Sequence, residues 1–300
     1  MRIAYLDCFS GLSGDMMLAA LVDAGADRDR IEQELRKLPL GPFRLEWKTV
    51  VKKGVSALKL DVVDEEQERA RGLKTLPVLA GSHHGHGEHS HEHQHHHGHG
   101  HGHHHHDHHH HDHSHEHRGH DHHHHDHSHH HRRYKEIAEI IEAADLAPRV
   151  AARAQAVFEK IAVAEAKIHN VPVETVHFHE VGALDSIVDI VGIALALEDL
   201  EIDRLYAGPV PTGNGYVRCD HGLYPVPAPA TMELLKGIPL RQTDIQKELT
   251  TPTGAGVAAA LVRQFGPLPA MTVEAIGYGA GTRDLPDQPN VLRVLIGHPC

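Results

Sequence analysis

Hydrophobic positions at the start of the chain change from a period of two to a helical period and back. Ile3, Tyr5 and Phe9 fall on one side of an alternating pattern, which predicts a strand before the glycine-rich turn SGLSGD. Ile31 and Leu35 instead recur at helical spacing. The patterns predict a strand, two helices and two further strands, in this order, over residues 2–9, 16–26, 29–38, 43–47 and 58–62.

The pattern stops after residue 63 and resumes at residue 134. Charged residues, proline and glycine accumulate over residues 64–82, which indicates a linker into a histidine-rich tract. Beyond the tract we expect helices over residues 134–145, 148–169, 229–235 and 253–265, a short extended piece and a buried helix within 173–200, and strands within 204–225 and at 271–276 and 291–296.

These elements predict an α/β (α+β) fold, with mixed sheets and helices interrupted by a disordered histidine-rich insert. We expect three segments. Residues 1–63 form a small β-α-α-β-β unit, residues 64–133 form the linker and tract, and residues 134–300 form a mixed α/β main domain. Whether the main domain packs against the first unit is left open by the sequence.

The tract between His83 and His131 holds 31 of the 36 histidines of the chain. Imidazole binds nickel, copper and zinc better than calcium or magnesium, so the tract predicts binding of late transition metals. The alternative is a solvated linker or a purification tag, although this tract is internal and interrupted by aspartates. The predicted tract ligands include His103, His104, His105, His106, His108, His109, His110 and His111.

Composition argues against several classes of protein. The formal net charge is −12 and aromatic residues make up 4% of the chain, so no basic and aromatic surface for nucleic acid is expected. The longest apolar run, residues 190–197, is far shorter than the roughly 20 residues that span a bilayer. Three cysteines without CxxC spacing, and a start without a signal-peptide pattern, favour a reducing cytoplasm.

The stretch HFHEVGALDSIVDI is the sharpest candidate metal site in the folded part. In an extended backbone His177 and His179 point to one face, and Glu180 and Asp185 follow closely enough to join them. His221 is a third candidate imidazole. The alternative is that both histidines are hydrogen-bonded, partly buried residues and that Asp185 is a helix N-cap.

Two glycine-rich turns are candidate anion sites. Ser13 and Gly14 follow a predicted strand and precede a helix, and ELTTPTGAG repeats this arrangement with Thr251, Thr253 and Gly254. Helix capping by Ser13 and by a threonine explains the turns equally well. In GYGAGTRD the guanidinium of Arg283 suits phosphate or carboxylate, and an ion pair with Asp284 is the alternative. Neither a dinucleotide fingerprint nor a P-loop is present.

Five stretches together resemble one known family. DCFSGLSGDM, HFHEVGALDSIVDIVG, PTGNGYVRCDHGLYPVPAPAT, ELTTPTGAG and GYGAGTRD are similar, in this order, to the nickel-insertion proteins that complete the nickel-pincer cofactor of lactate racemase. The resemblance implies a CTP-dependent cyclometallase, a lyase, that inserts Ni²⁺ into pyridinium-3,5-bisthiocarboxylic acid mononucleotide. Such proteins also carry a histidine-rich segment at this position.

The resemblance implies further components. The product holds nickel through two sulfurs and one carbon, so a base must remove a ring proton, and Glu180 or one of His177 and His179 is the candidate. CTP with a divalent metal is expected to bind mainly to a C-terminal domain that this sequence lacks and that a separate chain would supply. Lactate racemase receives the product, and a homo-oligomer is expected. The alternatives to an insertase are a noncatalytic nickel store and a metal-dependent hydrolase.

Overall fold

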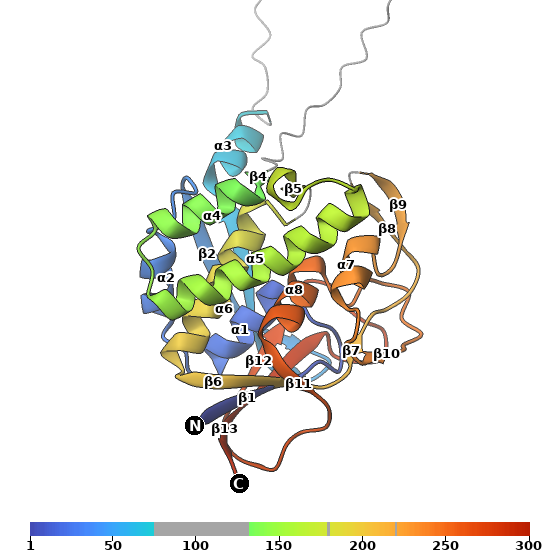
Figure 1. Cartoon of the computed structure of the whole chain (residues 1–300). Helices are drawn as coiled ribbons and strands as arrows, with labels where there is room; N and C mark the ends of the chain where they lie inside the picture. The colour runs from blue at the N-terminus through green and yellow to red at the C-terminus, as the bar shows by residue number, and fades with distance from the viewer. Residues whose placement is uncertain (75–131, 179–180, 220) are drawn as a thin grey trace, which may run out of the picture. The chain divides into compact units, whose positions relative to one another are not determined.

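The structure is a computed structural model that describes residues 1–74, 132–178, 181–219 and 221–300. These residues belong to one compact unit (Figure 1). The helices are α1 (Gly14–Asp23), α2 (Arg28–Leu35), α3 (Glu65–Lys74), α4 (Tyr134–Ala143), α5 (Pro148–His169), α6 (Leu184–Asp199), α7 (Pro229–Leu234) and α8 (Pro252–Leu261). A 3-10 turn spans Val173–Thr175.

The central feature is a seven-stranded mixed sheet in the order β11-β6-β1-β13-β12-β3-β2. Its strands are β1 (Arg2–Asp7), β2 (Phe43–Lys52), β3 (Val55–Asp64), β6 (Ile202–Ala207), β11 (Val262–Phe265), β12 (Met271–Ala280) and β13 (Val291–Pro299). Strand β1 runs antiparallel to β13 and parallel to β6. The first 63 residues and the last hundred therefore contribute strands to the same sheet.

The remaining strands are short and form two-stranded ladders. They are β4 (Arg132–Arg133) with β5 (His177–Phe178), β7 (Val210–Pro211) with β10 (Leu240–Arg241), and β8 (Tyr216–Cys219) with β9 (Gly222–Pro225). The ladder of β4 with β5 is antiparallel and pairs Arg133 with His177. It joins the residues that follow the tract to the segment before α6.

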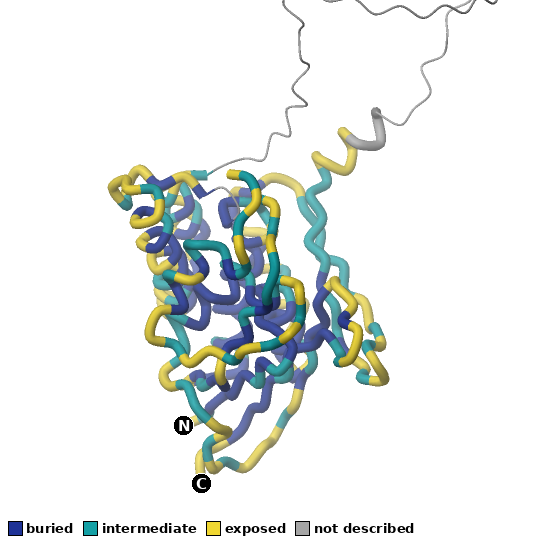
Figure 2. Tube along the Cα trace, turned by 90° about the vertical axis from the view of Figure 1, so that its right-hand side faces the viewer, coloured by how far each residue is buried: buried dark blue, intermediate teal, exposed yellow. Residues whose placement is uncertain are grey.

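Helices α1, α6 and α8 cover one face of the sheet, and α5 lies across α6 and α8 (Figure 1). Every residue of α6 from Ser186 to Leu197 is buried, which suits a helix that is apolar on almost all sides. Buried segments gather between these helices and the central strands, whereas the β2–β3 hairpin is mostly of intermediate exposure (Figure 2). The hydrophobic core therefore lies between the helices α1, α6 and α8 and the central sheet.

The predicted fold class is confirmed: helices and mixed sheets alternate along the chain. The predicted linker is wrong in part, because residues 65–74 form α3. Asp64 accepts hydrogen bonds from the backbone N–H groups of Glu66 and Gln67 and so starts this helix. Charge alone did not distinguish a solvated helix from a linker. The predicted insert itself lies outside the described residues.

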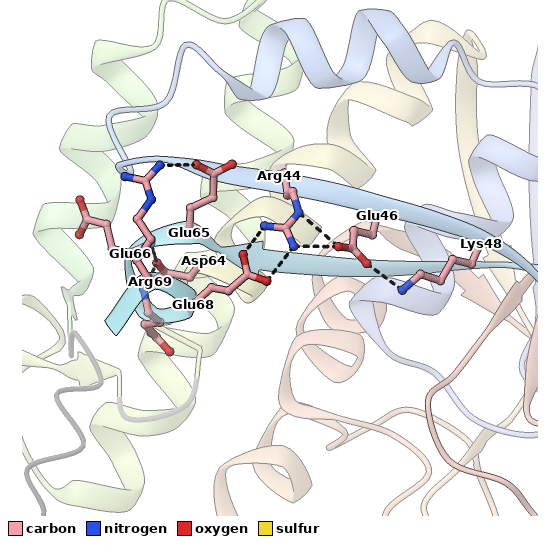
Figure 3. A network of polar contacts seen from close by, with 9 residues as sticks. Arg44, Glu46, Lys48, Asp64, Glu65, Glu66, Glu68 and Arg69 are labelled. Carbon is pink, nitrogen blue, oxygen red and sulfur yellow. Dashed lines mark hydrogen bonds and ion pairs between the residues drawn. The ribbon is translucent and has the colours of Figure 1, made fainter. Parts of the chain in front are cut away.

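An exposed network of charges ties the β2–β3 hairpin to α3 (Figure 3). Arg44 donates to Glu68 at 2.6 Å and to Glu46 at 2.9 Å, and Lys48 donates to Glu46 at 2.7 Å. Arg69 pairs with Glu65 one turn earlier in α3. These ion pairs give Glu46, Glu65 and Glu68 a cationic partner each.

Candidate functional site

The first turns of α1, α6 and α8 meet at one cavity of about 440 Å³, which we call the helix-start cavity. It is lined by Ser13, Gly14, Asp15, Leu60, Asp61, Val62, Val181, Asp185, Ser186, Asp189, Glu248, Thr251, Pro252, Thr253 and Thr282. Unpaired N–H groups and the positive end of the helix dipole favour anions at each helix start. Five predicted site residues, far apart in sequence, therefore lie around one cavity.

Close backbone approach brings α1 and α8 together. The Leu12 N–H donates to the Leu249 carbonyl at 2.9 Å, and the Thr251 N–H donates to the Leu12 carbonyl at 3.1 Å. A Cβ on Gly254 would lie 2.2 Å from the Leu12 carbonyl oxygen, and one on Gly14 would lie 2.5 Å from a carboxylate oxygen of Asp189. The protein itself fills the space beside both glycines, and Gly254 does not line the helix-start cavity.

Hydroxyl groups mark the three helix starts. Thr251 is the N-cap of α8, and its side chain accepts from the Gly254 N–H at 3.2 Å, as the capping alternative predicts. Thr253 and Ser186 join α8 to α6 through their hydroxyls at 3.4 Å. Ser13 occupies the N-cap position of α1 without a capping bond and donates to Asp15 instead. The predicted capping bond from Ser13 is therefore wrong.

Two carboxyl groups at the cavity are displaced from their usual ionisation. Burial raises the pKa of Asp15, and neighbouring Asp185 adds to the rise. Burial raises the pKa of Asp189 well above its ordinary value, and Asp15 and Asp185 raise it further. Asp189 is 8% exposed, and its Oδ1 has no hydrogen-bond partner among the described residues. Both groups therefore resist carrying a negative charge.

Asp185 lies at the cavity but does not cap α6. The N-cap of that helix is Ala183, and Asp185 sits in the first turn, where its Oδ1 accepts from the Ser186 N–H at 2.8 Å. The N-cap alternative for Asp185 is therefore wrong. Its predicted metal-binding role stays a prediction.

Arg283 lines a second cavity of about 200 Å³ that shares Ser13, Asp15 and Thr251 with the helix-start cavity. Its Nη1 donates to the Glu248 carbonyl at 2.6 Å. Asp284, the partner that the sequence suggested for Arg283, pairs with Lys52 instead. This alternative is therefore wrong, and the guanidinium stands beside the cavities, 47% exposed.

The two predicted imidazoles that the structure describes, His177 and His221, do not line the helix-start cavity. His177 is exposed on β5, while its neighbour Phe178 is buried, as the alternation predicts. His221 lies between β8 and β9, with its ring 4.8 Å from that of His169, beside a separate cavity of about 40 Å³. His179, Glu180 and the tract lie outside the described residues.

Among the residues described, no three side chains of histidine, cysteine, aspartate or glutamate are grouped to hold a metal ion. The same part of the chain contains no helix long and apolar enough to span a bilayer. The predicted metal ligands of the folded part therefore stay predictions.

The sequence did not single out Asp15, Ser186, Glu248 or Thr282 as cavity residues. Asp15 lies in the same motif as Ser13, and its place in the first turn of a predicted helix was the available signal. Asp189 was recognisable as polar within an apolar helix, because α6 otherwise buries small and aliphatic residues. Glu248 and Thr282 come from loops, whose positions no periodicity predicts.

Three curated relatives are similar to this chain over nearly its whole length. A protein of Geobacillus kaustophilus named pyridinium-3,5-bisthiocarboxylic acid mononucleotide nickel insertion protein is 49% identical over 297 residues, which are 99% of this chain and 60% of the relative. Proteins of the same name from Staphylococcus epidermidis and Staphylococcus saprophyticus are 42% and 41% identical, over 98% and 97% of this chain and 59% of each relative. No solved structure matches the chain.

The chain spans about three fifths of the length of these relatives. A family model described as nickel insertion protein matches residues 4–299. The match includes the strands of the central sheet and all three helix starts at the cavity. This chain therefore belongs to the nickel insertion protein family.

Proposed function

We propose that this protein inserts Ni²⁺ into pyridinium-3,5-bisthiocarboxylic acid mononucleotide and that the helix-start cavity binds this substrate. The observation that carries the proposal is the meeting of three helix starts at a cavity of about 440 Å³. This volume lies in the range of about 300–1,000 Å³ that is typical of small-molecule sites. Membership of the family and the names of the relatives support the choice of substrate.

The phosphate of the mononucleotide is the group that the helix starts recognise in this proposal. The helix dipoles of α1 and α8 favour an anion, and the hydroxyls of Ser13 and Thr253 supply polar contacts. Arg283, in the adjoining cavity, adds a guanidinium suited to phosphate. The raised pKa of Asp189 reduces the negative charge that an incoming phosphate meets.

Nickel is delivered from the histidine tract in this proposal. Sulfur donors and a metal–carbon bond hold nickel more firmly than scattered imidazoles, so transfer to the substrate is downhill. His177 pairs with Arg133 in the β4–β5 ladder. Arg133 is the second residue of the described part that follows the tract. We propose that His177 and His179 pass the ion on toward the cavity.

The family resemblance supplies the finer parts of the proposal. We propose that the reaction is that of a CTP-dependent cyclometallase in the cytoplasm, with CTP and its divalent metal bound mainly by a C-terminal domain outside this sequence. Lactate racemase then receives the product, and the protein acts as a homo-oligomer. The support for these finer parts is the resemblance alone.

The direct experiment supplies the full chain, together with a chain that carries the C-terminal domain, with the mononucleotide, Ni²⁺, CTP and its divalent metal, and follows nickel incorporation by mass spectrometry of the product. The proposal expects a nickel-containing product with the wild-type chain. It expects less product from a His177→Ala, His179→Ala double variant that keeps its tract. Undiminished transfer by this variant would remove both histidines from the route, and no product with wild type would overturn the proposed activity.

A nickel store without catalysis is the second candidate, and the 31 histidines of the tract favour it. Deletion of residues 83–131 separates the two functions. A store loses all nickel-dependent behaviour with its tract, whereas an insertase needs a higher nickel concentration and still forms product.

A further inference from the structure

We propose that Asp15 accepts the proton that the substrate ring loses when nickel bonds to the ring carbon. This inference rests on the proposed function and assigns its base to the described cavity. The sequence pointed to Glu180 or one of His177 and His179 for this role. Glu180 and His179 lie outside the described residues, and His177 lines neither cavity. Asp15 is a different carboxyl group, on α1.

Position is the first observation in favour of Asp15. Its side chain lines both the helix-start cavity and the adjoining cavity of Arg283, so it stands where the two meet. A ligand whose phosphate lies near Arg283 and the α8 start reaches across Asp15. Asp15 is of intermediate exposure and lines both cavities, so a ligand there can reach the residue, as a proton acceptor requires. Its Oδ1 is oriented by the Ser13 hydroxyl, which donates to it.

Asp189 is the second, independent observation. This side chain lines the same cavity, is only 8% exposed, and leaves its Oδ1 without a partner in the described residues. The Asp15 backbone N–H lies close enough to the Asp189 carboxyl to lower its pKa. A Cβ on Gly14 would meet Asp189 at 2.5 Å, so glycine at this position is what lets the two carboxyl groups share the start of α1.

The two carboxyl groups divide the proton between them. Proximity of Asp15 raises the pKa of Asp189, which burial has already raised further than that of Asp15. Asp189 therefore takes the first proton of the pair and Asp15 is the member that ionises. An ionised carboxylate with a raised pKa is a stronger base than an ordinary aspartate, which suits it to removing a carbon-bound proton.

The other charged groups around Asp15 come from three neighbouring segments. Lys59 on β3 lowers the pKa of Asp15, and Asp185 on α6 raises it. Asp61 on β3 and Glu248 also line the helix-start cavity. Three of these four side chains are acidic and one is a lysine, and this excess of acidic groups favours Ni²⁺ near the ring and proton uptake by Asp15.

The proposed step balances without an oxidant or reductant. The ring C–H bond breaks, its electron pair forms the carbon–nickel bond, and the proton passes to the Asp15 carboxylate. Nickel enters and leaves as Ni(II), and Asp15 later releases its proton to water. Asp189, beside the start of α1, takes no part in the proton transfer.

The test measures nickel insertion by the full chain, with the C-terminal domain supplied as a second chain, in the presence of Ni²⁺, CTP and the mononucleotide. Asp15→Asn should lower the insertion rate about 10²–10⁴-fold, the usual contribution of a general base. Asp15→Glu, which keeps a carboxylate, should retain measurable insertion. Asp29→Asn is the matched control, because Asp29 occupies the equivalent second position of α2 and is exposed. This control variant should insert nickel at the wild-type rate.

A purely structural role is tested by chemical rescue. In Asp15→Ala, added formate should restore part of the insertion rate, because a small carboxylate can occupy the vacated space. Deuterium at the reacting ring carbon should also slow Asp15→Asn more than wild type, since proton removal then limits the rate.

Each outcome of these experiments supports or contradicts either the assignment of Asp15 or the proposed function. Insertion by Asp15→Asn close to the wild-type rate would overturn the assignment while leaving the proposed function intact. Equal losses in the Asn and Glu variants, with no formate rescue in samples whose circular dichroism matches wild type, would overturn it as well. Failure of the wild-type chain to insert nickel would instead overturn the proposed function itself.

Discussion

The pKa values of carboxyl groups are shifted in opposite directions in the helix-start cavity and in the charge network of Figure 3. At the cavity, burial raises the pKa of Asp15 and Asp189. In the network, hydrogen bonds from Lys48 and Arg44 lower the pKa of Glu46, and a hydrogen bond from Arg44 lowers that of Glu68. Carboxyl groups kept from water resist ionisation, and those hydrogen-bonded to a cation at the surface stay ionised.

This difference in ionisation separates carboxyl groups suited to proton transfer, in the cavity, from carboxyl groups that keep the surface charged, in the network. The network lies on the outside of a hairpin, where ion pairs contribute little to stability and are screened by salt. The cavity lies at the meeting of three helices, where a charge is expensive and its loss or gain has consequences for a bound ligand. A count of carboxylates along the sequence would treat the two regions alike.

The same effect of burial on ionisation should be largest for a cysteine thiol. Burial raises the pKa of Cys8 to about 12, whereas Cys300 is exposed. Cys8 should then react with an alkylating reagent at pH 8 about 10³-fold more slowly than an unburied thiol, because only the thiolate is nucleophilic. Mass spectrometry of modified peptides, in buffer and then in urea, measures this protection. Equal labelling of Cys8 and Cys300 in buffer would break the comparison.

Asp189→Asn should raise the free energy of unfolding at pH 7 by about 1–3 kcal/mol, because the wild-type carboxyl is held in a site that disfavours its charge. The folded pKa lies above the unfolded one, so the stability that Asp189 contributes is complete below the unfolded pKa and is lost as pH rises through the folded value. Urea unfolding at pH 7 and near pH 3.5 measures the difference. A gain that is as large in acid as at pH 7 would show that the buried charge is not its cause.

Thr251→Ala should lower the free energy of unfolding by about 1 kcal/mol, because α8 loses its N-cap hydrogen bond to the Gly254 N–H. The conservative variant Thr251→Ser keeps the hydroxyl and should stay close to wild type. Urea unfolding of the three proteins provides the measurement. If both variants lost the same stability, the methyl group rather than the cap would be responsible.

Arg44→Ala should have the smallest effect, despite removing the hub of the charge network. Its ion pairs are exposed, so the urea midpoint should shift little at low salt and still less at 1 M salt, where charges are screened within about 3 Å. A shift comparable with that of Asp189→Asn would erase the distinction between the two regions.

Periodicity predicted most of the helices and strands because each buries a regular face. The long helix α5 ends where Asn170 adopts a left-handed conformation, as the Asn and Pro signals indicated. The sequence could not show that β1 lies between β6 and β13, since strand order depends on contacts among residues far apart in the chain. It also could not separate α3 from a linker, because a solvated helix lacks an apolar stripe.

The candidate site was predictable in its parts and not in its assembly. Ser13, Thr251 and Asp185 were each singled out by a local turn or helix start, and the fold brings them to one cavity. His221 carried a comparable local signal and lies at a separate cavity. What differs is the path of the backbone between the motifs, above all the close approach of Leu12 to Thr251.

The short β4–β5 ladder has a consequence for how such chains diversify. Arg132 pairs with Phe178 and donates to the Gly182 carbonyl at 3.0 Å, so the segment that follows the tract is anchored by its own hydrogen bonds. On the other side of the tract, α3 is anchored through the hairpin by Arg44. With both attachment points fixed, mutation can lengthen or shorten the run of histidines between them without rebuilding the fold.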